Sequence, residues 1–234
     1  MQALEIRGLV FDKDGTLFDF HRTWSAWGAA LIRDITGGDD GHAKALAEAL
    51  AFDLENASFL PGSPLIAGTI DVLIDAVVEL LPGTDADELR LLVLAETAAI
   101  KPVEAVPLVP LLDRLKADGN ILGIATNDAE GPARAHLIAA GVLEHFDFIA
   151  GYDSGHGAKP GPGMLQAFCA ATGLPAGACA MIGDTTHDLE SGRAAGMVTV
   201  GVLTGLSTRE DLADMADVVL DSIAGLPEWI ATRG

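Results

Sequence analysis

The chain has 234 residues, half of them hydrophobic, and a formal net charge of −20. This length and apolar content can form a substantial core, as one large domain or a domain with an insert, whereas the negative charge argues against nucleic acid as a partner. A membrane-spanning segment is not expected either, because the longest apolar candidate, residues 65–81, is interrupted by Gly68 and three acidic residues.

The first predicted element is a buried strand over Gly8–Phe11, which leads directly into Asp12-Lys13-Asp14-Gly15-Thr16. Open α/β sheets place their active sites at the carboxyl ends of strands. Asp12 is therefore a candidate nucleophile and Asp14 a candidate proton carrier. An acidic turn is the alternative, because Asp and Gly are ordinary turn residues. No basic stretch precedes an apolar region at the N-terminus, so no signal peptide is expected.

The following segment, residues 19–105, is predicted to be a helical insert between the first two strands of the sheet. Apolar residues follow the spacing of a helix face in three stretches, over residues 24–35, 66–81 and 89–100. His21, Arg22 and Trp24 come directly after the first motif and are candidates to overhang a pocket. Arg22 suits a second anionic group, such as a carboxylate, or it is an exposed hinge residue.

From residue 106 onward, short apolar strands alternate with helices. The predicted strands are Ile121–Ala125, Phe148–Ala150, Ala180–Ile182, Val198–Val202 and Val218–Leu220. The helices between them are expected to end at glycines that adopt the left-handed conformation, namely Gly119, Gly141, Gly173 and Gly196. Continuous rather than alternating apolar strands are typical of a parallel sheet buried on both faces. The pattern therefore predicts an α/β fold with right-handed crossovers.

Three further polar segments follow strands or lie in the loops after them. Thr126-Asn127 is a possible phosphate grip, with a hydroxyl and a backbone N–H at a helix entrance, or simply a helix cap. Lys159 projects from a loop of glycines and a proline, either toward a site or into solvent. Asp184 and Asp188 follow a strand and provide hard oxygen ligands of the kind that Mg²⁺ prefers.

Taken in chain order, these four motifs resemble those of the haloacid dehalogenase superfamily of phosphohydrolases, in particular its phosphoglycolate-phosphatase-like branch. The resemblance covers nearly the whole chain. It implies an α/β protein whose Rossmann-like parallel-sheet core consists of residues 1–18 and 106–234. Residues 19–105 would then form a helical cap domain.

The resemblance also implies a role for the catalytic and phosphate-binding residues. Asp12 would be the nucleophile that forms an aspartyl-phosphate. Asp14 would protonate the leaving oxygen and then activate the hydrolytic water. Thr126 and the Asn127 backbone would hold the phosphoryl group, and Lys159 would offset its charge.

The same resemblance implies a Mg²⁺ cofactor. The ion would be bound by the Asp12 carboxylate, the Asp14 backbone carbonyl and Asp184. Asp188 would bind it through a water molecule or would contact the residues that bind it. Physical reasoning supports this assignment, because crowded carboxylates repel one another and raise their pKa values unless a cation lies among them. Mg²⁺ and Lys159 would provide that positive charge within a strongly acidic protein.

Several residues keep two interpretations. Lys13 either packs on the core or faces solvent, and His187 either touches substrate or only begins a helix. A phosphonate hydrolase would need a lysine in the cap, for which Lys44 is the candidate.

We therefore expect a Mg²⁺-dependent phosphatase, a phosphoric monoester hydrolase that acts on a small phosphorylated metabolite resembling phosphoglycolate. A phosphosugar mutase of the same fold and a non-catalytic binding protein are the alternatives. No nucleic-acid or membrane partner is expected. Cys169 and Cys179 lack the spacing of a disulfide framework or zinc site, which favours a reducing, cytoplasmic location. The substrate and the oligomeric state are not predicted.

Overall fold

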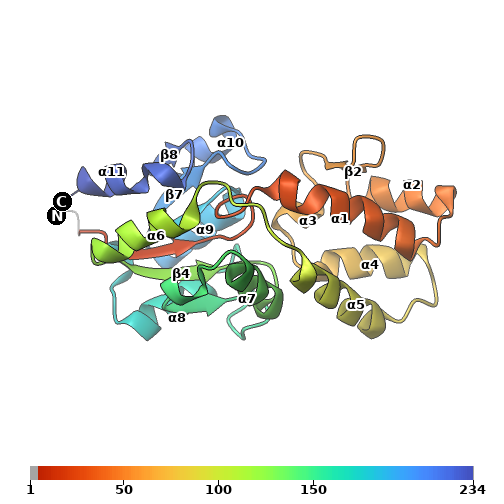
Figure 1. Cartoon of the computed structure of the whole chain (residues 1–234), viewed down its shortest axis with the longest axis horizontal. Helices are drawn as coiled ribbons and strands as arrows, with labels where there is room; N and C mark the ends of the chain where they lie inside the picture. Colours follow the sequence, from red (N-terminus) through yellow and green to blue (C-terminus); the bar gives the residue numbers. More distant parts are fainter. Residues whose placement is uncertain (1–4, 234) are drawn as a thin grey trace.

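The computed structural model describes residues 5–233, and a six-stranded parallel sheet lies at its centre (Figure 1). The strand order is β5-β4-β1-β6-β7-β8. The strands are β1 (Gly8–Phe11), β4 (Ile121–Ala125), β5 (Phe148–Ala150), β6 (Cys179–Gly183), β7 (Val198–Val202) and β8 (Val218–Leu220). All six predicted strands are confirmed, and β6 is one residue longer at each end than expected.

Helices cover both faces of this sheet, and successive residues of β1 pack on opposite sides. Leu9 and Phe11 belong to one buried cluster, whereas Val10 belongs to another. The helices of this part are α6 (Leu108–Ala117), α7 (Glu130–Ala139), α8 (Gly163–Thr172), α9 (Thr186–Ala195), α10 (Arg209–Ala213) and α11 (Leu226–Ala231). Because both faces of the sheet are buried, its strands are uninterrupted runs of apolar residues and do not alternate between apolar and polar residues.

The predicted ends of four helices are confirmed, because the glycine after each has a positive φ. These glycines are Gly119 (φ +86°), Gly141 (+71°), Gly173 (+71°) and Gly196 (+77°).

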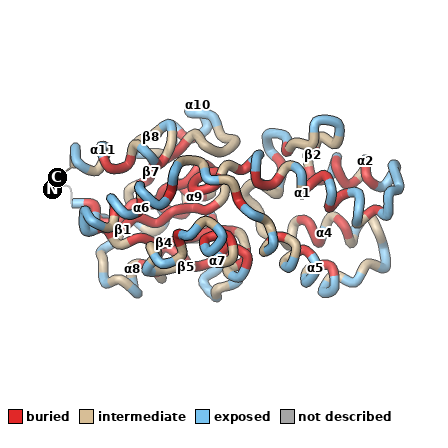
Figure 2. Tube along the Cα trace, viewed as in Figure 1, coloured by how far each residue is buried: buried red, intermediate tan, exposed pale blue. Residues whose placement is uncertain are grey.

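The helical insert, residues 19–105, has a hydrophobic cluster of its own, separate from the two clusters that flank the sheet. Figure 1 shows it beside the sheet, and Figure 2 shows the buried faces of its helices turned toward one another. Its elements are α1 (Phe20–Ile35), α2 (Asp40–Ala49), β2 (Phe52–Asp53), β3 (Ser58–Phe59), α3 (Pro64–Ala67), α4 (Ile70–Leu80) and α5 (Ala86–Ala99).

Two features of the insert differ from the sequence expectation. The helix predicted over 66–81 is divided into α3 and α4, because Gly68 is extended and Thr69 begins the second helix. Helix α2 was not predicted, since it buries only Ala43, Leu46 and Ala47. The expected domain boundaries stay a prediction, and the two ends of the expected core, residues 1–4 and 234, lie outside the described residues.

Contacts between the insert and the sheet-forming part include polar contacts as well as packing. Helix α5 packs on α7, where the His136 ring nitrogen Nε2 lies 2.8 Å from the Thr97 carbonyl oxygen. The side chain of Asn127 also donates to the Ala67 carbonyl oxygen at 2.8 Å. Within residues 5–233, no helix has the length and apolarity to cross a membrane.

Candidate active site

Three carboxylates meet at the carboxyl edge of the sheet. Asp12 follows β1 and Asp184 follows β6, and these two strands are parallel neighbours in the sheet. Asp188 lies in the first turn of α9, directly after β6. All three residues are buried, and one oxygen from each lies within 4.8 Å of the others. The structure thus brings together three of the four residues named above as metal ligands.

Lys159 lies between two of these carboxylates, not in solvent. Its Nζ is 2.7 Å from Asp12 Oδ1 and 2.6 Å from Asp188 Oδ1, and its side chain is 3 % exposed. The Asn127 side chain fixes the loop: its Oδ1 accepts from the Lys159 backbone N–H at 2.8 Å, and its Nδ2 donates to the Lys159 carbonyl at 2.9 Å. Sequence reasoning assigned only the Asn127 backbone to the site and missed this positioning contact.

The electrostatics of the cluster show an excess of negative charge. Burial, together with repulsion from Asp188, raises the pKa of Asp12 to about 7, although Lys159 opposes the shift. Burial, together with repulsion from Asp12 and Asp188, raises the pKa of Asp184 well above its usual value. Burial alone would lower the pKa of Lys159, but Asp12 and Asp188 outweigh it and raise that pKa. One ammonium group therefore does not neutralise the cluster.

The space around Asp184 fits a metal ligand that is held in one orientation. Thr16 Oγ1 donates to Asp184 Oδ1 at 3.3 Å. Gly15 and Gly205 approach the same carboxylate so closely that a Cβ on either would lie 2.3 or 1.7 Å from Oδ2. Gly15 also has a φ of +78°, which favours glycine. Oxygen donors, excess negative charge and this glycine-lined cradle together suit a divalent cation.

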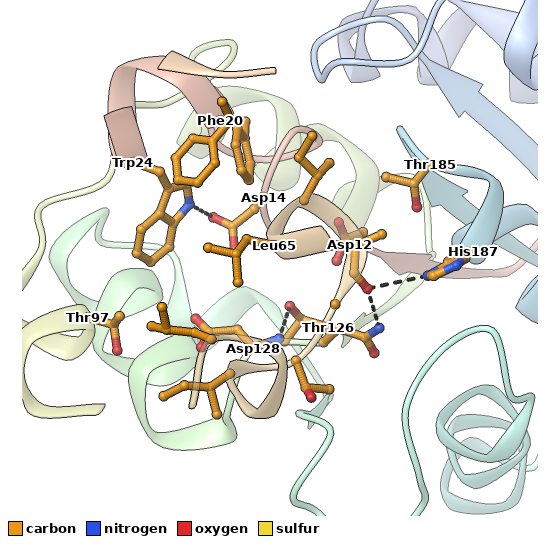
Figure 3. A pocket seen from close by; sticks show the side chains of 18 of the residues that line it. Asp12, Asp14, Phe20, Trp24, Leu65, Thr97, Thr126, Asp128, Thr185 and His187 are labelled. Carbon is orange, nitrogen blue, oxygen red and sulfur yellow. Dashed lines mark hydrogen bonds between the residues drawn. The ribbon is translucent and has the colours of Figure 1, made fainter. Parts of the chain in front are cut away.

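The second aspartate of the first motif, Asp14, has both carboxylate oxygens hydrogen-bonded. Trp24 Nε1 donates to Oδ1 at 2.8 Å, and Lys13 Nζ donates to Oδ2. The Trp24 side chain comes from α1, so the insert contributes directly to this carboxylate (Figure 3). Of the three residues expected to overhang the pocket, Trp24 does so, whereas His21 and Arg22 are exposed and do not line it.

Lys13 is fully buried and belongs to a polar cluster that sequence reasoning did not foresee. Its Nζ lies 3.2 Å from Asp128 Oδ2 and 3.0 Å from His136 Nδ1. Burial lowers the pKa of Lys13, but Asp14 and Asp128 more than offset it, so the pKa is raised. Burial and the nearby ammonium lower the pKa of His136, which makes its Nδ1 an acceptor from Lys13. The sequence does not point to His136, because it is a single histidine in a helix and belongs to no motif.

The remaining predicted residues also lie at this edge. Thr126 is buried and lines the pocket. Its hydroxyl oxygen accepts from the Asp128 backbone N–H at 3.1 Å, which stabilises the loop before α7 but does not cap that helix, whose N-cap residue is Ala129. Asp188 Oδ2 accepts from the backbone N–H and hydroxyl of Thr185 at 3.0 and 2.7 Å. His187 lines the pocket with Nδ1 3.4 Å from the Ala67 carbonyl oxygen.

A cavity of about 840 Å³, its open mouth included, extends from Asp12 and Lys159 into the insert. Figure 3 shows Phe20, Trp24 and Leu65 of the insert around Asp14 at one end, and Thr185 and His187 at the other. Lys44 is exposed and does not line the cavity, so no lysine of the insert, among the described residues, lies where a phosphonate hydrolase would need one.

Comparison with known proteins agrees with this geometry. The sequence matches the haloacid dehalogenase-like hydrolase family over residues 6–196. It is 30 % identical to a phosphoglycolate phosphatase of Rhodospirillum rubrum, over 96 % of this chain and 90 % of that protein. It is 38 % identical to the probable phosphatase IndB of Dickeya dadantii, over 47 % of this chain and 48 % of that protein. In fold it is similar to the crystal structure of a predicted phosphoglycolate phosphatase of Haemophilus somnus, with a TM-score of 0.69 and 20 % sequence identity. The match covers 98 % of this chain and 99 % of that one.

Proposed function

Because the chain belongs to the haloacid dehalogenase-like hydrolases, we propose that it hydrolyses a small phosphomonoester through an aspartyl-phosphate formed on Asp12, with Mg²⁺ as cofactor. The chain is a phosphoric monoester hydrolase, as its family and its phosphatase relatives indicate. The observation that supports the proposed mechanism best is the convergence of Asp12, Asp184 and Asp188 on Lys159 at the carboxyl edge of the sheet.

The proposed reaction has two steps at phosphorus. A carboxylate oxygen of Asp12 attacks, the bond from phosphorus to the ester oxygen breaks, and Asp14 gives its proton to the departing oxygen. Asp14 then takes a proton from a water molecule as that water attacks the phosphorus. Inorganic phosphate leaves, and the Asp12 carboxylate is restored. Trp24 and Lys13 fix the direction of the Asp14 carboxylate, and one of these two bonds would give way when Asp14 carries the proton.

The other residues would hold the phosphoryl group in line with Asp12. Phosphoryl transfer depends mainly on positioning and on neutralising charge. Lys159 is already 2.7 Å from Asp12 and would extend its ammonium to the phosphoryl oxygens. The Thr126 hydroxyl and the Asn127 backbone, at the carboxyl end of the neighbouring strand β4, would bind the same oxygens.

Asp12, Asp184 and the backbone carbonyl of Asp14 would hold Mg²⁺, and Asp188 would lie next to these ligands. The bound ion would supply positive charge against the charge that develops on the phosphoryl oxygens. We further propose that the helical insert acts as a cap, because Trp24 and its neighbours close one side of the cavity.

The test is phosphate release from a panel of phosphorylated metabolites, beginning with phosphoglycolate, the compound named for the R. rubrum relative. We expect turnover with Mg²⁺, none after chelation, and a loss of at least about a thousandfold in Asp12→Asn. Asp214→Asn, an exposed residue of the same type, is the matched control. Metal-independent turnover or an active Asp12→Asn would overturn the mechanism. An isomerised product without free phosphate would identify a mutase, and an inactive wild-type protein would favour a binding protein.

A further inference from the structure

The part of the cavity that lies beyond the phosphate-binding residues has an apolar wall. The insert provides it from five separate elements, α1, β3, α3, α4 and α5, which argues for a built pocket, since no single helix face could form it. Its residues include Phe20, Trp24, Phe59, Leu65, Ile66 and Ile70. The rings of Phe20 and Phe59 meet edge to face at 5.2 Å, so part of this wall is a rigid aromatic pair.

The polar side-chain groups that the insert places on this wall are already bound within the protein, including the Thr69 hydroxyl, which donates to Asp71 Oδ2 at 3.1 Å. Trp24 Nε1 donates to Asp14, and Trp27 Nε1 donates to Glu96 at 3.2 Å. The hydroxyl of Thr97 donates to the Leu94 carbonyl at 3.2 Å. A ligand rich in hydroxyl groups would therefore lose hydrogen bonds to water without gaining replacements on this side.

The charge of the wall excludes a second anionic group even more strongly. Among the described residues that line the cavity, Lys159 is the only lysine or arginine, and Asp12 and Asp188 already flank it. Asp14 and Asp128 add negative charge to the same cavity. The five lysines and arginines of the insert, Arg22, Arg33, Lys44, Arg90 and Lys101, do not line it. A ligand carboxylate would be buried here without a cationic partner.

We infer that the group esterified to the phosphate is an uncharged, hydrocarbon-rich alcohol, either aryl-methyl or branched alkyl. The pocket disfavours esters that carry a carboxylate or several hydroxyls, including phosphoglycolate itself. This inference rests on the proposed function, because the phosphoryl group must lie beside Asp12 for the alcohol to reach the insert.

The test compares benzyl phosphate with 4-carboxybenzyl phosphate, two esters of alcohols with similar leaving-group chemistry that differ by one carboxylate. Each turnover consumes one water and releases the alcohol and inorganic phosphate. We expect kcat/KM for the neutral ester to exceed that for the carboxylated ester by at least about tenfold. Equal values, or a preference for the carboxylate, would overturn the inference.

Acetyl phosphate separates this inference from the proposed function, because its acyl group is too small to need the apolar wall. If Asp12-dependent turnover is absent with acetyl phosphate and with both benzyl esters, the proposed function fails. If acetyl phosphate is hydrolysed but neither benzyl ester is, the proposed function stands and the apolar-alcohol inference fails.

A pair of variants tests the wall itself. Leu65→Lys places a cation on the half-buried pocket side of the insert, and we expect the preference for the neutral ester to fall at least about threefold. Leu91→Lys adds the same charge to the insert at a residue that is 70 % exposed and outside the cavity, and should leave the preference unchanged. An unchanged preference in Leu65→Lys, or the same change in both variants, would contradict the assignment.

Discussion

Replacing Lys13 by methionine removes a fully buried cation from between two carboxylates while keeping most of the side-chain volume. Lys13 Nζ contacts Asp14 and lies 3.2 Å from Asp128 and 3.0 Å from His136 Nδ1. It also lies 5.3 Å from the centre of the Trp24 ring. In Lys13→Met the two carboxylates, which are 15 % and 17 % exposed, remain in the interior without that positive charge.

Breaking a buried ion pair by removing one partner costs about 3–5 kcal/mol of stability, because the remaining charge is uncompensated. For a protein of this length, that corresponds to a fall in Tm of roughly 6–20 °C. The loss should be larger at pH 8 than at pH 5. Lys13 opposes the rise in the pKa of Asp128, so without the ammonium Asp128 retains its proton to a higher pH in the folded state, and stability decreases as the pH rises through that pKa. Burial already raises the pKa of Asp128.

Calorimetric Tm at the two pH values is the assay. Lys101→Met, at an exposed lysine of the insert, is the matched control and should change stability by less than about 0.5 kcal/mol. The double variant Lys13→Met/Asp128→Asn should recover part of the loss, since it removes one unpaired carboxylate. A Tm within a few degrees of wild type, or a double variant less stable than Lys13→Met, would refute the reasoning.

Three other predictions concern residues that contact Asp184, Asp14 and Lys13. In Gly205→Ala, the added Cβ would overlap the Asp184 carboxylate, with 1.7 Å to Oδ2, so we expect phosphatase activity to fall at least about a hundredfold and the Mg²⁺-induced rise in Tm to disappear. Trp24→Phe removes the donor to Asp14 and should lower kcat by roughly 10–100-fold with that Mg²⁺-induced rise intact; an unchanged kcat would contradict the positioning role. Because the folded-state pKa of His136 is lowered, its contribution is lost as the pH falls below about 6.5, so His136→Gln should reduce the drop in Tm between pH 7 and pH 5.

The strands and the motif positions could be predicted from the sequence because they follow local rules. A strand buried on both faces is a short apolar run, and all six such runs became strands of one sheet. In a parallel sheet the carboxyl ends of neighbouring strands meet at one edge. This rule alone accounts for the proximity of Asp12 and Asp184, which are 172 positions apart in the chain.

The rest depends on contacts between distant segments, which local patterns do not encode. Nothing around His136 indicates that α7 carries its ring to Lys13 and to the Thr97 carbonyl oxygen. The apolar spacing of the insert predicts helices, but equally fits a packed core or a pocket wall. The position of Trp24 directly after the first motif made it a candidate for the pocket, but only the arrangement of the helices shows that Leu65 lines the cavity too.

The Asn127 amide contacts both parts of the molecule, since its NH₂ group donates to Ala67 of the insert and to Lys159 of the catalytic loop. Any movement of the insert away from the sheet would break the bond to Ala67. The Asn127 side chain would then keep its two bonds to the Lys159 backbone but lose one constraint on its own orientation, so the position of the insert would be coupled to how firmly Lys159 is held.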